Sequence, residues 1–374
     1  MNDPRHVKLA QVLVNYSLRV QPGDKVAILT QVGGAPLARE VYREALRAGA
    51  HPVARISLNP SLAIGSFDGL TEITLREGSE EQVRFSDFDL QEIERYDALL
   101  VIWADENTKG MSGISPERMA LAQQASGPVM GRMMERAMAG ELRWCITLFP
   151  TVAYAQEAGM ALSEYEEFVL DAGLLDRDDP AAAWREAQAE MQRVASLLGQ
   201  RDEIRIVAPG TDLTYRVGGR TWVDTSGTNN FPDGEVFTGP IEDSANGTVR
   251  FTYPAIYAGT EVEDVRLTFR AGKVVEATAA RGQEFLHAML DQDEGARFLG
   301  EVAFGMNYGI TRFTRNILFD EKIGGTMHLA LGRSYPNTGG TNESSLHWDM
   351  ICDLREGRVY ADGEICYENG RFTI

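Results

Sequence analysis

The sharpest chemical signal in the sequence is the tripeptide His347-Trp348-Asp349 near the C-terminus. In a β-strand, residues two apart project from the same face, so the imidazole and the carboxylate would lie side by side. Such a pair could hold one divalent cation, because both groups are common ligands of these ions. The same tripeptide also fits a surface strand that carries one hydrogen-bonded histidine, and the local pattern leaves both interpretations open.

His328 and Tyr335 are further candidates in the same part of the chain. His328 lies in the apolar segment Gly325–Leu331, where alternation could bury the imidazole as a ligand or as a hydrogen-bonded core residue. Tyr335 precedes Pro336 and a glycine pair. A tyrosine in such a loop serves packing more often than catalysis, so local sequence alone assigns neither residue to a site.

Two glutamates lie where turn residues meet expected regular structure. Glu235 follows Pro232-Asp233-Gly234 and precedes a strand-like segment, and Glu301 follows Gly300 where an apolar helical pattern ends. Neither glutamate identifies a ligand by itself, since separation along the chain does not give distance in space. The sequence contains no C-x-x-C, H-E-x-x-H or G-x-S-x-G motif, and Thr30–Ala35 lacks the glycine spacing of a phosphate loop.

Alternating strand and helix patterns in the first half of the chain predict the scaffold. The apolar runs Val26–Leu29 and Leu99–Trp103 are typical of strands that are covered on both faces. Leu37, Val41 and Ala45 recur at helical spacing between strand-like segments. Alternation of this kind predicts a parallel sheet with helices, which is an α/β domain.

The pattern changes near residue 200. A long helix is expected from Pro180 to Gly199, and a shorter one over Gln283–Leu299. The remaining second half is dominated by short segments rich in β-branched and aromatic residues, with Ala271-Gly272, Glu356-Gly357 and Asn369-Gly370 as hairpin turns. We therefore predict an α/β protein with an N-terminal parallel-sheet domain, residues 1–200, and a strand-rich α+β domain, residues 201–374, that contains all the candidate ligands.

Composition excludes several classes of function. The chain has 374 residues, of which 44% are hydrophobic and 24% charged, as in a globular protein. Its net charge of -19 disfavours nucleic acid and anionic membrane as partners. No apolar run is long enough to span a membrane, and the N-terminus lacks a signal-peptide pattern. Three scattered cysteines, Cys145, Cys352 and Cys366, argue against a disulfide framework and predict a cytoplasmic protein.

Several segments, taken in order, resemble the thermophilic-type aminopeptidases, the group of aminopeptidase T and aminopeptidase S. The N-terminal half also resembles the family around Leu13–Leu18 and Ala155–Met160, so the resemblance covers nearly the whole chain. The segments that carry it most specifically are Asn230–Pro240, Leu299-Gly300-Glu301, Leu318–Glu321, His328–Gly332 with Tyr335, and Asn342-x-Ser344-x-x-His347-x-Asp349.

The resemblance implies a metal-dependent aminopeptidase that acts on peptides with a free N-terminus. It implies two divalent ions per chain, Zn, Co or Mn, and a homodimer. Glu301 would bridge the two ions, and Tyr335 would lie next to them as a second catalytic residue. The matching metal ligands are Glu235, Glu301, His328, His347 and Asp349.

The sequence departs from the family pattern on both sides of this set. The segment between Glu321 and His328 is slightly longer than in the family, and the loop between Tyr335 and His347 is much shorter. Glu321 lies near the expected site by motif but is not among the matching ligands. Because the short loop borders the expected site, we expect it to affect which substrates are preferred more than which residues bind the metals.

Two other functions compete with peptide hydrolysis. The 2,5-dihydroxypyridine dioxygenases, which hold a single Fe(II), resemble the same family and share the stretch Glu242–Thr248. Glutamate at both 235 and 301 favours two metals over a single iron. A non-enzymatic metal or peptide binder is the third possibility, and the complete set of expected ligands argues against it.

Overall fold

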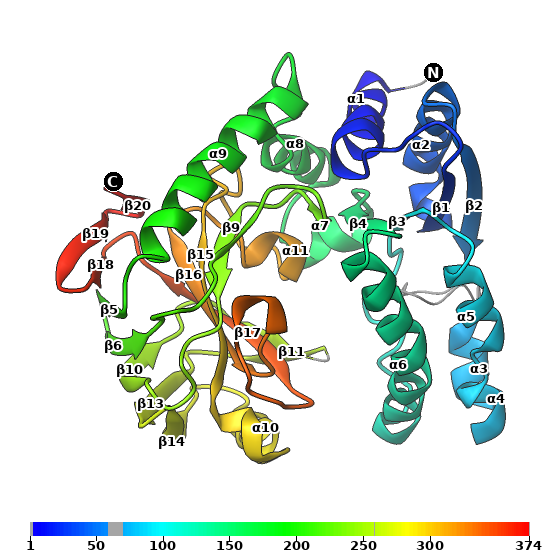
Figure 1. Ribbon diagram of the computed structural model, residues 1–374. Helices are drawn as coiled ribbons and strands as arrows, with labels where there is room; N and C mark the ends of the chain where they lie inside the picture. Colours follow the sequence, from blue (N-terminus) through cyan, green and yellow to red (C-terminus); the bar gives the residue numbers. More distant parts are fainter. Residues whose placement is uncertain (1–2, 59–69, 258, 374) are drawn as a thin grey trace. The chain divides into compact units, whose positions relative to one another are not determined.

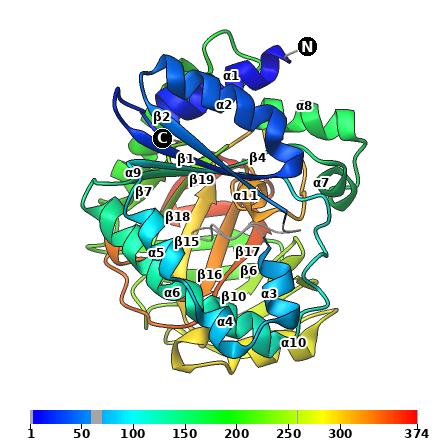
Figure 2. The same cartoon turned by 90° about the vertical axis from the view of Figure 1, so that its right-hand side faces the viewer.

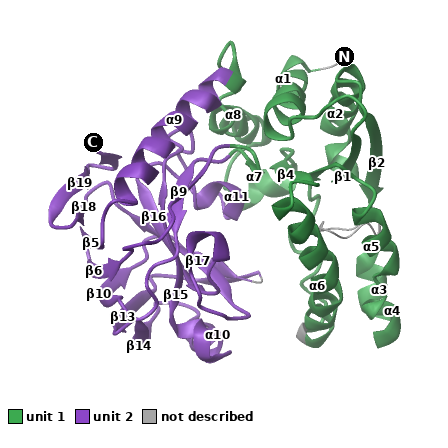
Figure 3. Ribbon diagram, viewed as in Figure 1, with its two compact units in different colours: residues 1–181, 227–232 green, residues 182–226, 233–374 purple. Residues whose placement is uncertain are grey.

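The computed structural model describes residues 3–58, 70–257 and 259–373. The chain forms two compact units (Figure 3), residues 1–181 with 227–232 and residues 182–226 with 233–374. The long helix α9 (Pro180–Leu198) begins where the first unit ends, and the chain returns to the first unit for six residues before it completes the second. Within the described residues, no helix has both the length and the apolar character needed to cross a membrane.

A five-stranded sheet, entirely parallel, forms the centre of the first unit. Its strands follow the order β2-β1-β3-β4-β8. The central strands β1 and β3 are buried along almost their whole length, which explains their continuous apolar runs and confirms the predicted α/β character. The strands are β1 (Lys25–Gln31), β2 (His51–Ser57), β3 (Ala98–Trp103), β4 (Arg143–Leu148) and β8 (Asn230–Phe231).

Helices connect the strands of this sheet, and local sequence sets where several of them begin. The side chain of Ser115 accepts a hydrogen bond from the backbone N–H of Arg118 and caps the longest one, α6, against which α4 and α5 pack (Figure 1). Helix α2 buries Leu37, Val41 and Ala45, as their spacing predicted. The helices are α1 (Pro4–Val12), which continues into a π-helical turn, α2 (Ala35–Arg47), α3 (Thr71–Glu77), α4 (Glu80–Arg84), α5 (Asp87–Ile93), α6 (Pro116–Met138), α7 (Val152–Glu157) and α8 (Leu162–Ala172).

The second unit is rich in antiparallel strands. An eight-stranded sheet has the order β14-β13-β10-β6-β5-β18-β19-β20. Its hairpin turns include Ala271-Gly272 and Asn369-Gly370, both with positive φ, as predicted. The hairpin expected at Glu356-Gly357 is wrong, because β18 after it pairs with β5 and β19 and the strand before it belongs to another sheet. The strands are β5 (Glu203–Ala208), β6 (Thr211–Arg216), β10 (Asn246–Arg250), β13 (Arg266–Arg270), β14 (Lys273–Thr278), β18 (Arg358–Ala361), β19 (Glu364–Glu368) and β20 (Arg371–Phe372).

A second antiparallel sheet, with five strands in the order β17-β16-β15-β9-β7, carries the candidate residues (Figure 2). One hydrophobic core joins it to the eight-stranded sheet and to α9, and includes Val194, Ile206, Val302 and Leu329. The strands are β7 (Val223–Thr225), β9 (Glu235–Thr238), β15 (Leu299–Gly305), β16 (Thr326–Gly332) and β17 (His347–Asp353), and a separate hairpin is formed by β11 (Ala255–Tyr257) and β12 (Thr260–Val262).

The helix expected over Gln283–Leu299 is wrong in its second half. Helix α10 ends at Leu290, a 3-10 turn spans Glu294–Arg297, and Leu299 begins β15. The Asp293 side chain accepts hydrogen bonds from the backbone N–H groups of Gly295 and Ala296, which starts a new turn. The apolar residues after this turn pair with β16 and therefore form a strand. A short helix, α11 (Ile317–Asp320), precedes β16.

Candidate metal centre

The five expected ligands lie on neighbouring strands of the antiparallel five-stranded sheet in the second unit. Glu235 begins β9, and Glu301 lies on β15. His328 is on β16, and His347 and Asp349 are at the start of β17. Four segments that are far apart in the chain therefore meet on adjacent strands.

The strand register puts these side chains on one face. Ala330 of β16 pairs with Glu301 on one side and with Asp349 on the other, so all three lie in one row across the sheet. His328 and His347 each lie two residues from a member of that row and therefore project from the same face.

A β-bulge at Gly300 sets the register of Glu301. The pairing of β15 with β16 shifts between Leu299 and Glu301. A Cβ atom at Gly300 would lie 2.3 Å from the carbonyl oxygen of Gly332, a distance that no side chain tolerates. Only glycine fits here, and the bulge directs the next side chain, Glu301, toward the other candidates.

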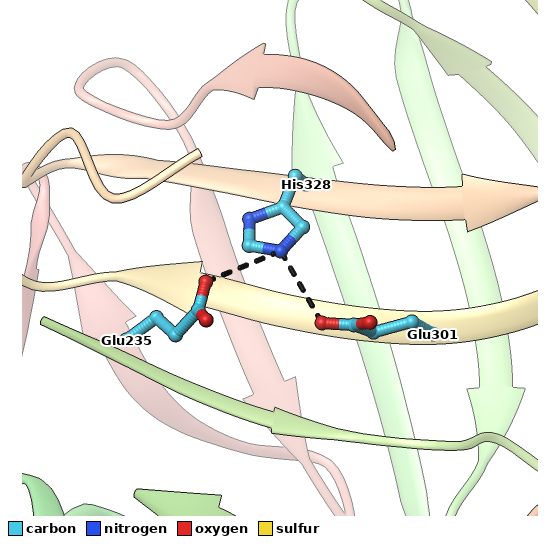
Figure 4. Close-up of side chains that lie close together, drawn as sticks. All are labelled: Glu235, Glu301 and His328. Atoms are coloured by element: carbon cyan, nitrogen blue, oxygen red, sulfur yellow. Dashed lines mark ion pairs between the residues drawn. The ribbon is translucent and has the colours of Figure 1, made fainter. Parts of the chain in front are cut away.

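The carboxylates surround the Nε2 atoms of the two histidines. His328 Nε2 lies 3.4 Å from both Glu235 Oε2 and Glu301 Oε1, and Figure 4 shows its imidazole directed between the two carboxyl groups. His347 Nε2 lies 3.4 Å from Glu301 Oε2 and 3.6 Å from Asp349 Oδ2. Glu301 thus faces one imidazole with each of its oxygens. Glu301 is common to two groups of residues that could each hold a cation, Glu235-Glu301-His328 and Glu301-His347-Asp349.

Backbone carbonyls orient both imidazoles. His328 Nδ1 is 2.9 Å from the carbonyl oxygen of Glu321, and His347 Nδ1 is 2.8 Å from that of Arg333. A carbonyl oxygen only accepts hydrogen bonds, so each Nδ1 carries the proton. In the neutral imidazole the lone pair is then on Nε2 and points at the carboxylates, which is the arrangement of a metal-bound histidine.

Burial and mutual charge perturb the titration of the cluster. Burial alone would lower the pKa of the histidines, but the neighbouring carboxylates raise that of His328 to about 10 and that of His347 to about 9. Burial raises the pKa of Glu235 and Asp349. Burial would also raise the pKa of Glu301, but the two imidazoles lower it. So many buried ionisable groups in one place are typical of a functional site.

The oxygen atoms of the cluster fit a divalent cation. Among the described residues, Glu235 Oε2 and Asp349 Oδ1 are buried without a hydrogen-bond partner. An unpaired buried carboxylate oxygen is costly, and a cation in this place would satisfy it. Oxygen and imidazole ligands together suit Zn, Co or Mn.

Glu321 belongs to this cluster, although it is not among the five ligands expected from the sequence. Its carboxylate can form a third cation-binding group with His328 and Asp349. The available sequence signal was its place in Leu318–Glu321, a segment that already carries the resemblance. Lys322 is a second residue that the sequence did not point to, since its side chain is completely buried beside Glu235 and Glu321.

Tyr335 lies at the edge of the cluster. Its ring packs edge to face against His347, with 5.0 Å between centroids, and also against Phe237. Loss of hydration raises the pKa of its phenol, and Glu301 and Asp349 raise it further, although part of the side chain remains exposed. The hydroxyl therefore keeps its proton at neutral pH and can donate a hydrogen bond.

Comparison with known proteins establishes the family of this chain. The sequence profile of the thermophilic metalloprotease family, M29, matches residues 2–372. The chain belongs to this family. It is therefore a metallopeptidase, an enzyme that hydrolyses peptide bonds, as the resemblance predicted.

The relatives and a solved structure cover nearly the whole chain. Aminopeptidase 2 of Geobacillus stearothermophilus is 30% identical over 96% of this chain and 94% of its own length. Aminopeptidase T of Thermus thermophilus is 28% identical over 98% and 95% of the two chains. The structure of wild-type AmpT from the same organism aligns with a TM-score of 0.83 at 25% identity and covers 99% of each chain.

The dioxygenase alternative is supported only by a similarity of fold. The structure of 2,5-dihydroxypyridine dioxygenase from Pseudomonas putida aligns with a TM-score of 0.55 at 15% identity, over 98% of this chain and 96% of that chain. A likeness at that identity concerns the fold and not the reaction.

Proposed function

We propose that this metallopeptidase is an aminopeptidase that removes single residues from peptides with a free N-terminus. The relatives named aminopeptidase 2 and aminopeptidase T support the position of cleavage. The observation that carries the chemistry is the buried cluster around Glu301, in which oriented Nε2 atoms and unpaired carboxylate oxygens converge.

The proposed centre holds two divalent ions per chain. Glu301 would bridge them, because it is common to the groups Glu235-Glu301-His328 and Glu301-His347-Asp349. Three carboxylates against two dications leave a net charge of about +1, which favours deprotonation of a bound water. Glu321 is a further ligand candidate through its group with His328 and Asp349.

The chain's own residues prepare the reaction. When bound, the ions would supply an acidified water and polarise the scissile carbonyl. The carbonyls of Glu321 and Arg333 keep the two imidazoles in the ligand tautomer. The phenol of Tyr335, protonated at neutral pH, would donate a hydrogen bond to the oxygen that becomes negative in the transition state.

The family relationship also leads us to expect a homodimer, and the three cysteines, all buried and free, are consistent with the reducing cytoplasm. Static light scattering at micromolar concentration tests the first expectation. A mass near that of one 41.3 kDa chain would contradict it.

Metal analysis combined with a peptidase assay tests the proposed function. Purified protein should contain two Zn, Co or Mn ions per chain and should hydrolyse an amino-acid p-nitroanilide. EDTA should abolish this activity, added Co or Zn should restore it, and the N-acetylated substrate should be resistant because its amine is no longer charged. Undiminished hydrolysis after complete metal removal would refute the proposal, and a single iron without peptidase activity would favour the dioxygenase.

A further inference from the structure

The buried ammonium of Lys322 has no part in the proposed mechanism. The side chain has no exposed surface and lies two residues after Asp320, where α11 ends. Its Nζ lies 3.6 Å from Glu235 Oε1 and donates a hydrogen bond to Glu321 Oε1. A lysine is almost never completely buried unless its charge is paired, and the buried carboxylate of Asp233 adds to the negative charge around this one.

The charge of Lys322 is held in place by the fold. Opposite charges within about 6 Å favour the charged form of a side chain, so the contacts with Glu235 and Glu321 keep Lys322 an ammonium. The backbone is anchored on both sides, because the Lys322 N–H donates to the carbonyl of Phe319 and the Lys322 carbonyl accepts from the N–H of Asn307. The ammonium is therefore a fixed cation beside the cluster.

The two oxygens of Glu235 serve different partners. Oε1 faces Lys322 and accepts a hydrogen bond from the hydroxyl of Thr225, whereas Oε2 faces His328 Nε2 and has no hydrogen-bond partner among the described residues. Glu321 also gives one oxygen to Lys322, and its carboxylate is within reach of His328 and Asp349. A single ammonium thus holds two carboxylates from separate elements and leaves one oxygen of each for another cation.

We propose that Lys322 is a positioning residue of the metal centre, which restricts Glu235 and Glu321 to one metal-binding oxygen each and offsets the charge of the fourth carboxylate. The inference rests on the proposed function, because it presupposes bound divalent ions. With Glu321 included, four carboxylates against two dications leave no net charge. The ammonium supplies the positive charge that keeps the centre able to polarise a carbonyl.

This role predicts two effects of opposite sign when the ammonium is removed. The cluster becomes more negative and both carboxylates gain a free oxygen, so divalent cations should bind more tightly. The loaded centre is then less positive, so turnover should fall. A residue that only supports the local structure would instead weaken metal binding and activity together.

The test compares the full-length protein with Lys322→Met, which is similar in length and apolar. The affinity for Zn²⁺ is measured by competition with a chromophoric chelator, the number of ions by elemental analysis, and kcat and KM with an amino-acid p-nitroanilide. We expect Zn²⁺ to bind at least about threefold more tightly, kcat to fall at least about tenfold, and KM to change less than kcat. Lys322→Gln is the second variant, since its neutral amide can still donate to the carboxylates, and the same signs are expected for it if Lys322→Met does not fold.

Lys273→Met, a change of an exposed lysine on β14, is the control and should alter none of these quantities. Weaker Zn²⁺ binding in a folded variant, or an unchanged affinity, would overturn the inference. A rise from one bound ion to two on removal of Lys322 would also overturn it, since the ammonium would then replace a metal ion. Absence of Zn²⁺ binding by the unsubstituted protein would instead refute the proposed function, and the inference with it.

Discussion

The two five-stranded sheets of this protein both have deeply buried central strands, but these strands bury different groups. In the parallel sheet of the first unit, strands such as β3 bury an unbroken aliphatic run. In the antiparallel sheet of the second unit, β9, β15 and β16 are equally buried but include Glu235, Glu301 and His328. Burial of ionisable groups is unfavourable unless they are paired or bind a metal.

Residues that maintain the fold differ from residues that serve the reaction in how their burial affects the free energy of the folded chain. A buried apolar strand lowers the free energy of the folded chain directly. The buried carboxylates around Glu301 raise that free energy until a counter-charge neutralises them. Substitutions in the two regions and removal of the metal test this difference.

Replacement of the shared carboxylate should have the largest effect. Glu301→Gln removes a charge from both proposed ion sites and leaves only a neutral amide oxygen. We expect weaker metal binding and a fall in turnover of at least about 100-fold, or about 2.7 kcal/mol, measured by elemental analysis and steady-state kinetics. Folding should survive because the exchange is nearly isosteric.

The matched control is Glu40→Gln on α2 of the first unit. Glu40 is also buried, but it forms an ion pair with Arg43 and is remote from the candidate ligands in the sequence. This change should leave kcat and metal content unaltered. Normal metal content and rate in Glu301→Gln would show that the buried cluster is not the metal centre.

Glycine at the β-bulge should matter for both stability and activity. In Gly300→Ala the new Cβ would lie 2.3 Å from the carbonyl oxygen of Gly332, so the strand must shift. We expect a loss of about 1–3 kcal/mol in the free energy of unfolding, measured by denaturant titration, together with reduced kcat because Glu301 moves.

Gly131→Ala in α6 of the first unit provides the contrast. A Cβ there meets no atom within 4 Å, and alanine favours a helix more than glycine does. That variant should gain up to about 1 kcal/mol without a change in kcat. Equal behaviour of the two glycine variants would contradict the role assigned to the bulge.

The metal-free protein should lose stability as the pH rises. The folded pKa values of His328 and His347, about 10 and 9, lie above their unfolded value, so their stabilising contribution is complete below about pH 6.5. It is lost progressively as the pH rises from there through 9 and 10, because the imidazoles then give up their protons. Thermal unfolding of EDTA-treated protein between pH 6 and 10 measures this loss.

His347→Gln should reduce this pH dependence, whereas His287→Gln, on α10, should leave it as it is. Saturating Zn²⁺ should also reduce it, because a bound cation replaces the protons on Nε2. A melting temperature of the metal-free protein that rises between pH 7 and 9 would show that the imidazoles are not paired with the carboxylates.

The phenol of Tyr335 should give the smallest effect. Tyr335→Phe keeps the ring that packs on His347 but removes the donor to the developing oxyanion. We expect kcat to fall about five- to tenfold, or by about 1 kcal/mol, with unchanged metal content. A similar fall in Phe237→Leu, which alters only the neighbouring ring, would assign the effect to packing and not to the hydroxyl.

Local sequence determined much of the scaffold. The apolar run of β3, the helical spacing in α2, the proline that begins α9 and the turn at Ala271-Gly272 each predicted an element that the structure contains. These signals are reliable because periodicity and turn chemistry depend only on residues a few positions apart. The expected helix over Gln283–Leu299 went wrong where pairing with β16 overrode the local pattern.

Contacts between segments distant in the chain fix how the candidate residues meet. Residue types and motif resemblance named Glu235, Glu301, His328, His347 and Asp349, but no spacing along the chain brings them together. The row through Ala330 arises from strand register, and the direction of Glu301 from a bulge. Register depends on the packing of whole strands, and a shift of one residue would turn these side chains to the opposite face. Glu321 and Lys322 join the cluster for the same reason. No local feature of the sequence indicated that the lysine would be buried.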